Sequence, residues 1–448
     1  YTSNVQYTQF RQNDPFLNTA TNGITTLAAY PRSSLNGEVN AFLSNNVLYS
    51  HLTKNLTNTA KVRYYDRKDN TPTITFANYH YADTGIATTA PLTRNPHSYS
   101  QLSIEDLLKW QANRAWGFGA GYFFERFTFA NGEVDSTNEH GVKGFVNWTP
   151  YSWLTARSSL QYSERRYNTW LAGSTPSEAH AMRHFFVANR DRTKGNTIVE
   201  LQVSRNVTVS PNGGLRWDNY PTDTVLNEVA ALTNSLGTHY SRAWNIGTDL
   251  GVRVNPDLRL NFGYNHEEHN LYMESCCGAS LAFSDANKWT TKITQKYNTF
   301  MAAADWKAIP GKLDIKADYV AAISNEANDT TKCTSGASGC TGNNSVGVTN
   351  PFPDEHNIFQ RFSVMAKYYL DPAHVKRMGF GEVAIKARYI WEQNKNTNWA
   401  TDNFSPYSPS AADAGGTDIS NGGRSLFLAY ANPNYTAQIL ALSLVGKW

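Results

Sequence analysis

The sequence has no apolar run long enough to form a membrane-spanning helix. Such a helix needs about 18 to 20 consecutive apolar residues. Apolar stretches such as FMAAADW at 300–306 have only the length of a strand. The mean hydropathy of the chain is −0.51. A bundle of membrane helices is therefore excluded.

The sequence also has little net charge and lacks common catalytic and cofactor motifs. Its 40 Lys and Arg residues nearly balance its 37 Asp and Glu residues, so no strong field attracts nucleic acid. No glycine-rich phosphate loop opens a helix and no G-x-S-x-G sequence occurs, so we do not expect an enzyme. Covalent haem attachment requires C-x-x-C-H, which is absent, so we expect no cofactor bound by this chain itself.

The histidines do not form a recognisable metal site. His266, Glu267, Glu268 and His269 depart from the H-E-x-x-H zinc pattern, and on a strand His266 and His269 point to opposite faces. His180 and His184 have helical spacing but lie in a predicted loop. We interpret those two as a solvated loop pair.

Cysteine is scarce: the chain has four, Cys276, Cys277, Cys333 and Cys340. All lie in polar stretches rich in Gly, Ser and Asn, as expected for loops in an oxidising compartment. Cys333 and Cys340 enclose the segment TSGASG, and we favour a disulfide between them. Bridges between their loop and the loop of Cys276 and Cys277 are the alternative. Either disulfide pairing would cross-link a loop and would not take part in catalysis.

Aromatic residues, by contrast, are abundant, at 13% of the chain with 25 Tyr and 12 Trp. They recur near the end of segments in which apolar and polar residues alternate. Several charged residues follow the aromatic residue. Because successive side chains of a strand point to opposite faces, each segment predicts a strand with one apolar face. The seven clearest segments are AKVRYYDR (60–67), GFGAGYFFER (117–126), LTARSSLQYSER (154–165), GGLRWDNY (213–220), LRLNFGYNHEEH (258–269), LDIKADYV (313–320) and VAIKARYIWEQ (383–393).

This alternation predicts about sixteen strands in a single domain, residues 1–448. Tight connections such as 150–152 alternate with long ones such as 326–356, which is typical of outer-membrane barrels. We therefore predict an all-β fold, a transmembrane antiparallel up-and-down β-barrel with short periplasmic turns and long extracellular loops. A soluble sandwich or propeller is the alternative. The predicted strands lie near 1–11, 36–50, 56–67, 98–110, 115–127, 139–149, 153–166, 195–205, 208–218, 241–253, 258–269, 287–306, 312–325, 357–370, 379–394 and 435–448.

The two faces of the predicted strands differ in charge. In the third strand, Ala60, Val62 and Tyr64 share one face, and Lys61 and Arg63 share the other. Arg or Lys on the lipid face near the midplane costs roughly 2–4 kcal/mol, so we assign the charged face to the lumen. Two aromatic belts on the lipid face are predicted. Tyr64, Tyr122, Tyr162, Trp217, Tyr264 and Tyr389 form one, and Tyr49, Trp110, Trp148, Trp306 and Tyr368 form the other.

The last predicted strand carries a specific signal. In AQILALSLVGKW, Leu440, Leu442 and Leu444 share a face with the terminal Trp448. A final strand that ends in an aromatic residue resembles the signal by which the outer-membrane assembly machinery recognises its clients. We predict that these four residues form that signal, that the true C-terminus is present, and that the protein is integral to the bacterial outer membrane.

Several longer stretches also carry a family resemblance. They are SLNGEVNAFLSNNV (34–47), VRYYDRKDNTP (62–72), SYSQLSIE (98–105), GYFFERF (121–127), DSTNEHGVKGFVNWTPYSWLTARSSLQYSERR (135–166), FFVANRDRTKGN (185–196), RWDNYPTDT (216–224), SRAWNIGTDLG (241–251), DWKAIPGKLDIKADY (305–319) and the closing LALSLVGKW. Together, and in this order, they resemble the MtrB/PioB family of decahaem-cytochrome-associated outer-membrane proteins.

The resemblance implies a barrel that serves as a sheath. In such complexes a periplasmic multihaem cytochrome is inserted in the lumen, a second multihaem cytochrome often docks outside, and electrons cross the outer membrane through stacked haems. The barrel holds no redox centre itself; haem c is expected in the partner. A sheath is needed because haem propionates and peptide groups could not be solvated by hydrocarbon.

The chain departs from the family in size. Members are usually longer, and some carry C-x-x-C near the N-terminus, which is absent here. Sixteen strands spaced about 4.8 Å apart and tilted near 40° give a backbone diameter of roughly 32 Å, of which side chains leave about 20 Å. That is tight for a folded multihaem domain. We expect either that further strands precede Tyr1 or that the partner is unusually thin.

A diffusion porin for small hydrophilic solutes is the alternative function. It shares the strand pattern, the belts and the terminal Trp448. The lumen face mixes both charges with Asn, Gln, Ser and Thr, which suits a water-filled pore or a polar protein interface equally well. An outer-membrane enzyme is a third class, for which the sequence offers no Ser/His/acid candidate.

Overall fold

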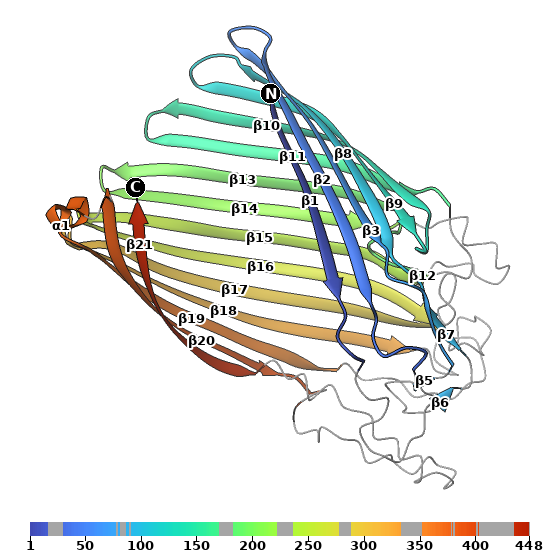
Figure 1. The fold of residues 1–448 in the computed structure, drawn as a ribbon. Helices are drawn as coiled ribbons and strands as arrows, with labels where there is room; N and C mark the ends of the chain where they lie inside the picture. The colour runs from blue at the N-terminus through green and yellow to red at the C-terminus, as the bar shows by residue number, and fades with distance from the viewer. Residues whose placement is uncertain are drawn as a thin grey trace.

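A single curled sheet of antiparallel strands makes up most of the described chain (Figure 1). The computed structural model describes residues 1–16, 30–77, 79–80, 87–88, 91–169, 182–221, 236–276, 288–332, 352–377, 379, 381–399, 402 and 434–447. Each long strand pairs with the next long strand in sequence. The sheet is therefore an up-and-down meander, as the alternating pattern predicts.

Sixteen long strands build this sheet, and the two-residue β12 (Met182–Arg183) joins it at β15. In chain order they are β1 (Thr2–Gln12), β2 (Gly37–His51), β3 (Leu56–Asp69), β8 (Ser98–Gln111), β9 (Trp116–Ala130), β10 (Ser136–Tyr151), β11 (Leu154–Tyr167), β13 (Arg190–Ser204), β14 (Val207–Asn219), β15 (Leu236–Asn255), β16 (Leu258–Cys276), β17 (Lys288–Ile309), β18 (Leu313–Lys332), β19 (Phe352–Tyr369), β20 (Glu382–Thr397) and β21 (Tyr435–Lys447).

Every predicted strand is present, but several extend further toward the long loops. The strands predicted at 195–205, 258–269 and 312–325 are observed at Arg190–Ser204, Leu258–Cys276 and Leu313–Lys332. The extensions of β13 and β18 are mostly polar on both faces, and that of β16 has Leu271 and Met273 on the face opposite to Tyr264, so the alternating signal is lost there. Backbone pairing continues nevertheless, since it depends on N–H and C=O groups and not on side chains.

A few elements outside the sheet had no alternating signal in the sequence. The loop between β3 and β8 contains the short strands β4 (Ile74–Phe76), β5 (Tyr79–His80), β6 (Ala87–Thr88) and β7 (Leu92–Arg94). Helix α1 (Pro372–Arg377) joins β19 to β20; Asp371 caps it by accepting a 2.8 Å hydrogen bond from the Ala373 amide. No helix of the described residues is long and apolar enough to cross a membrane.

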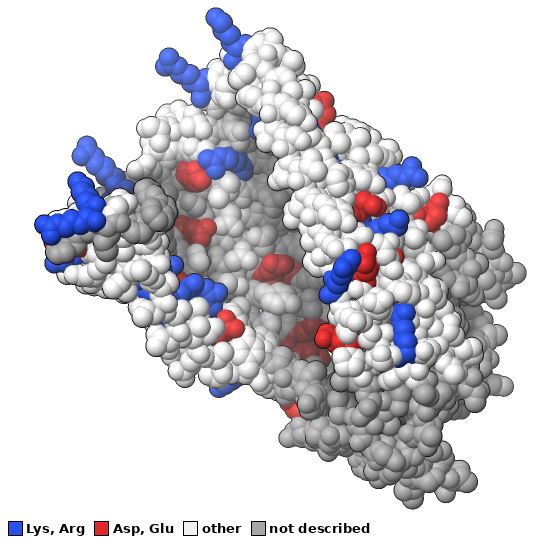
Figure 2. Space-filling model, in the orientation of Figure 1, with Lys and Arg blue, Asp and Glu red and all other residues white. Residues whose placement is uncertain are grey.

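The two faces of the sheet differ as predicted in polarity. Directly paired residues share a face, and the register aligns Phe262, Ala302, Tyr319, Phe362 and Trp391 in one row across β16 to β20. We call this convex side the apolar face. Large apolar side chains on it are exposed, Leu440 by 80%. The opposite, concave side is the polar face, and Figure 2 shows acidic and basic side chains inside the hollow that it encloses.

The two edges of the meander lie at β1 and β21. Within the described residues no backbone pairing joins these strands. Both carry exposed residues on each face, as edge strands do, with Tyr7 and Leu440 among the most exposed apolar side chains. The prediction that further strands precede Tyr1 stays a prediction.

Candidate functional site

A wall of amide side chains lies on the polar face across β13 to β16. Asn245 donates a 3.2 Å hydrogen bond to the side chain of Asn265. A Cβ atom added to Gly214 would lie 2.6 Å from Asn245 Oδ1 and 2.7 Å from Asn196 Oδ1. A side chain at this position would displace one or both amides, so the asparagines lie directly over the backbone of Gly214. We call this surface, including Asn212 and Gly247, the amide wall. Its asparagines are polar and uncharged, and two carboxylates border them: Glu267 is the direct partner of Asn245, and Asp249 lies 3.5 Å from Asn212 Nδ2.

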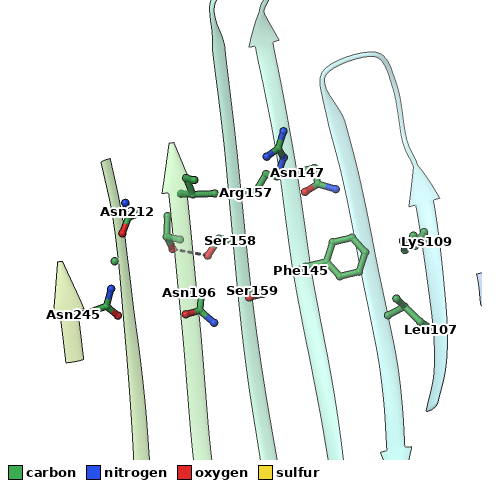
Figure 3. Close-up of a pocket in the computed structure, with 13 residues that line it drawn as sticks. Leu107, Lys109, Phe145, Asn147, Arg157, Ser158, Ser159, Asn196, Asn212 and Asn245 are labelled. Atoms are coloured by element: carbon green, nitrogen blue, oxygen red, sulfur yellow. Dashed lines mark hydrogen bonds between the residues drawn. The ribbon is translucent and has the colours of Figure 1, made fainter. Parts of the chain in front are cut away.

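A hollow of about 410 Å³ lies beside the amide wall, on the half of the sheet nearer the short turns (Figure 3). Asn196, Asn212 and Asn245 line it on one side, and Leu107 and Phe145 line it on the other. A Cβ atom added to Gly119 would lie 2.0 Å from the Phe145 ring. The Phe145 ring therefore occupies the space over Gly119 that a side chain there would fill.

An ion-pair network crosses four strands on the same face. Glu105 of β8 accepts a hydrogen bond from Lys61 Nζ of β3 at 2.9 Å and another from Lys143 of β10. The contact spans β9, on which Phe123 pairs with Glu105 and Gly121 pairs with Lys143, so Glu105 and Lys143 meet diagonally across that strand. Two lysines share one carboxylate, so the network carries a net positive charge.

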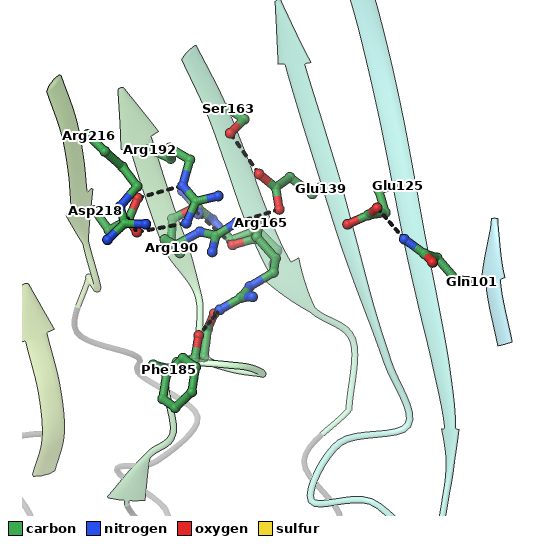
Figure 4. A network of polar contacts seen from close by, with 12 residues as sticks. Gln101, Glu125, Glu139, Ser163, Arg165, Phe185, Arg190, Arg192, Arg216 and Asp218 are labelled. Carbon is green, nitrogen blue, oxygen red and sulfur yellow. Dashed lines mark hydrogen bonds and ion pairs between the residues drawn. The ribbon is translucent and has the colours of Figure 1, made fainter. Parts of the chain in front are cut away.

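A more buried cluster lies at the loop end of β10, β11, β13 and β14 (Figure 4). Glu139 accepts hydrogen bonds from Ser163 Oγ and Arg190 Nη2, both at 2.7 Å. Arg192 donates to both carboxylate oxygens of Asp218, at 2.6 and 2.7 Å. Charge-assisted and bidentate bonds of this kind are strong and directional. We call these residues the mouth cluster. Their bonds fix the positions of the four strands relative to one another at the end of the sheet that carries the long loops.

Arg165 of β11, drawn beside this cluster in Figure 4, binds a loop segment. Its guanidinium donates to the carbonyl of Phe185 at 2.6 Å and to the carbonyl of Ala188 at 2.8 and 3.0 Å. Val187 and Ala188 are each 2% exposed, whereas Phe185 is 64% exposed. Because Arg165 belongs to the polar face, this segment is held on the concave side of the sheet.

His184 belongs to that segment, and the interpretation of it as a solvated residue was wrong. Its Nδ1 lies 2.6 Å from Glu133 Oε2, and the side chain is largely buried. Glu133 comes from the β9–β10 connection, a contact that spacing along the sequence cannot reveal. His180 lies outside the described residues.

Asp135 ties that connection to the end of β11. Its carboxylate accepts hydrogen bonds from Asn168 Nδ2 at 3.1 Å and from the Thr169 amide at 2.9 Å. Burial acts to raise the pKa of Asp135, but hydrogen bonds from Asn168, Thr169 and Ser136 outweigh it and hold the pKa below its ordinary value. The ionised carboxylate is thus the form that stabilises this turn.

We expect the turn at Asp135 to loosen only in strong acid. Because the folded pKa is lowered, its contribution is complete above the unfolded value of about 3.9 and is lost as pH falls through the folded value. Hydrogen exchange at the Thr169 amide, corrected for intrinsic rates, should show constant protection from neutral pH to about pH 4. Asp135→Ala should remove the protection at all pH values. Protection lost near neutral pH in the unsubstituted protein contradicts this assignment.

The predicted belt residues fall on the apolar face, with one exception. The register places Tyr64, Tyr122, Tyr162, Trp217, Tyr264, Tyr389, Trp110, Trp148, Trp306 and Tyr368 there. Tyr49 was assigned wrongly: it pairs with Thr59, two positions from Lys61, and so lies on the polar face. Their role as membrane-interface belts stays a prediction.

The remaining predicted residues are placed only in part. Leu440, Leu442 and Leu444 of β21 lie exposed on the apolar face, while Trp448 lies outside the described residues. Cys333 and Cys340 also lie outside them, so their pairing stays a prediction. His266 and His269 pair with Ile246 and Ala243 and lie on opposite faces. No group of metal-ligating side chains occurs in the part of the chain that is described.

The sequence did not predict the amide wall or the mouth cluster. For the amide wall the sequence offers only a local abundance of Asn and Gly, at 212–214, 245–247 and 261–265. Which asparagine faces which glycine depends on register between strands.

The two-faced sheet can be compared with known proteins. The family model described as outer membrane beta-barrel porin, MtrB/PioB, matches residues 1–448. The protein belongs to the MtrB/PioB family. It is an integral outer-membrane protein with a porin-like barrel fold, so the apolar face meets lipid and the polar face lines the lumen. The predicted fold class and localisation are confirmed, and the family is one of membrane barrels, not of enzymes.

Other comparisons add similarities of shape. No curated protein is significantly similar in sequence. The outer membrane transporter YddB from Escherichia coli is 11% identical, with a TM-score of 0.39 over 88% of this chain and 60% of YddB. A mutant of the ferric enterobactin receptor PfeA from Pseudomonas aeruginosa is 10% identical, with a TM-score of 0.40 over 99% of this chain and 72% of the receptor. The chain thus spans less than two thirds of the length of YddB.

Proposed function

We propose that this barrel is a sheath for a periplasmic multihaem c-type cytochrome. The cytochrome would be inserted in the lumen, and a second multihaem cytochrome would dock at the extracellular side. Electrons would cross the outer membrane through the haems of the partners, and this chain would bind no cofactor. Its part would be to keep the haem chain out of hydrocarbon, where propionates and peptide groups have no hydrogen-bond partners.

The observation that carries the proposal is the amide wall. The side chains of Asn196, Asn245 and Asn265 lie close over Gly214 and Gly247, which gives a lumen surface rich in amide donors and acceptors. Such a surface suits contact with another protein, because each amide can pair with a backbone or side-chain group of the partner. The family to which the chain belongs supports the same conclusion.

The second candidate is a diffusion porin. It is favoured by the segment that Arg165 holds on the lumen side, since porins use inward loop segments to narrow their channels. The hollow of about 410 Å³ beside the amide wall would then be filled by water and solute.

Current through single barrels separates the two candidates. We expect the complex purified from its host in mild detergent to pass little current in planar bilayers. Removal of the cytochrome with a chaotropic salt should open a large, steady conductance, and adding the cytochrome back should close it. A barrel that conducts fully as isolated, with no haem absorbance, supports the porin and contradicts the sheath.

A further inference from the structure

One row of paired residues crosses the lumen wall from β10 to β19. Each member is the direct partner of the next, so all share the lumen face. The row reads Lys143, Gln161, Lys194, Arg216, Ala243, His269, Gln295, Glu326 and Glu355. We call it the charge-sorted row, because its cations lie at one end and its anions at the other.

The basic end of the row lies on β13 and β14. Lys194 is exposed to the lumen, and no ion pair of Lys194 is found among the described residues. Arg216 approaches Asp218 only to 3.9 Å, and its side chain is 43% exposed. Arg192, two residues from Lys194 toward the loop end of β13, neutralises Asp218. The cations of this end therefore exceed its anions.

The acidic end lies on β18 and β19. Glu326 and Glu355 face each other directly across the two strands, an arrangement that is unfavourable for like charges unless a cation is near. Glu326 accepts a 2.6 Å hydrogen bond from the neutral Gln295. Within the described residues neither carboxylate has an ion pair. Glu267 of β16, in the next row toward the periplasm, adds a third carboxylate.

No Asp, Glu, Lys or Arg of the row lies between the two ends. Ala243, His269 and Gln295 occupy β15 to β17, and Ser241, His269 and Gln295 form a hydrogen-bonded chain that ends on Glu326. Six strand spacings of about 4.8 Å place Lys194 and Glu355 about 29 Å apart along the wall. This exceeds the Debye length of about 8 Å at physiological salt. The two ends therefore act separately on whatever fills the lumen.

We propose that the charge-sorted row fixes the rotation of the cytochrome about the barrel axis. An acidic surface of the cytochrome would face Lys194 and Arg216, and a basic surface would face Glu326 and Glu355. This inference rests on the proposed function and adds the chemistry of the partner's two faces. The amide side chains can pair with a partner in many rotations, whereas opposite charges at two places on the lumen wall favour one rotation.

Carbodiimide cross-linking of the native complex tests the proposal. A water-soluble carbodiimide joins an amine to a carboxylate only where the two are in contact. Lys194 should be linked to Asp or Glu of the cytochrome, and Glu326 and Glu355 to its lysines. The two sets of linked residues should lie on different faces of the cytochrome. Links from both ends to one face, or no links although haem co-purifies, would overturn the proposal.

Charge reversal supplies the second test. Lys194→Glu combined with Arg216→Glu should reduce the haem that co-purifies with the folded barrel about tenfold or more at low salt. The matched control is Lys307→Glu, an exposed lumen-face lysine at the periplasmic end of β17, which should change it less than about twofold. Equal haem in the double variant contradicts the inference. Haem missing from every barrel, including the unsubstituted one, contradicts the proposed function first.

Discussion

Replacing Glu139 by Ala should lower the free energy of unfolding by about 3–5 kcal/mol, the usual loss when one partner of a buried ion pair is removed. The side chains of Glu139 and Arg190 are 9% and 10% exposed. Without the carboxylate, Arg190 would keep its charge in a site that excludes water, and its Nε already lacks a hydrogen bond. Ser163 would lose its acceptor as well. Urea unfolding in lipid vesicles, followed by tryptophan fluorescence, measures the change.

A second ion pair on the same face provides the control. Arg157 and Glu200 are 3.1 Å apart, with side chains 51% and 40% exposed. Water and salt already screen this pair, so Glu200→Ala should cost only about 0–1 kcal/mol. Equal effects of the two substitutions would show that the mouth cluster is not buried as described.

Leu160→Arg should destabilise the barrel by about 2–4 kcal/mol, because it places a charge on the lipid face near the middle of the membrane. Leu160 lies near the centre of β11 and is 60% exposed. Its partners on the neighbouring strands are Gly144 and Gly195, which cannot shield it from lipid. The same unfolding assay in vesicles applies.

Ser159→Arg is the matched control on the adjacent residue. Ser159 points into the lumen between Phe145 and Asn196, where a guanidinium stays in water or meets a polar partner. We expect a change within about 0.5 kcal/mol. If Ser159→Arg is the more damaging of the two, the assignment of the faces is reversed.

The order of the strands was predictable because alternation is a local property. In β20 every second residue from Val383 to Trp391 is apolar, and in β11 Ser158 is the single exception from Leu154 to Tyr162; this pattern survives whatever the neighbouring strands do. The pattern weakens in β2, where Asn45 and Asn46 interrupt it. Tyr49 was therefore assigned by its place near the strand end and not by its face, and the assignment was wrong.

The site was less predictable because it depends on pairing between distant strands. Asn245 meets Gly214 and Asn265 only in one register, and a slip of one residue would turn each of them to lipid. The contacts of Arg165 with Phe185 and Ala188 join a strand to a loop across segments outside the described residues. The charge-sorted row requires register across eight pairings, which no local signal encodes.

The number of haems per barrel in the complex purified from native membranes tests the central claim most directly. A tagged barrel is isolated in mild detergent, its amount is fixed by amino-acid analysis, and haem c is measured by the pyridine haemochrome spectrum. A sheath predicts several haems for each barrel, all lost when the cytochrome is stripped with chaotropic salt. A pure, folded barrel with no haem, whose lumen passes a steady current, would contradict the account.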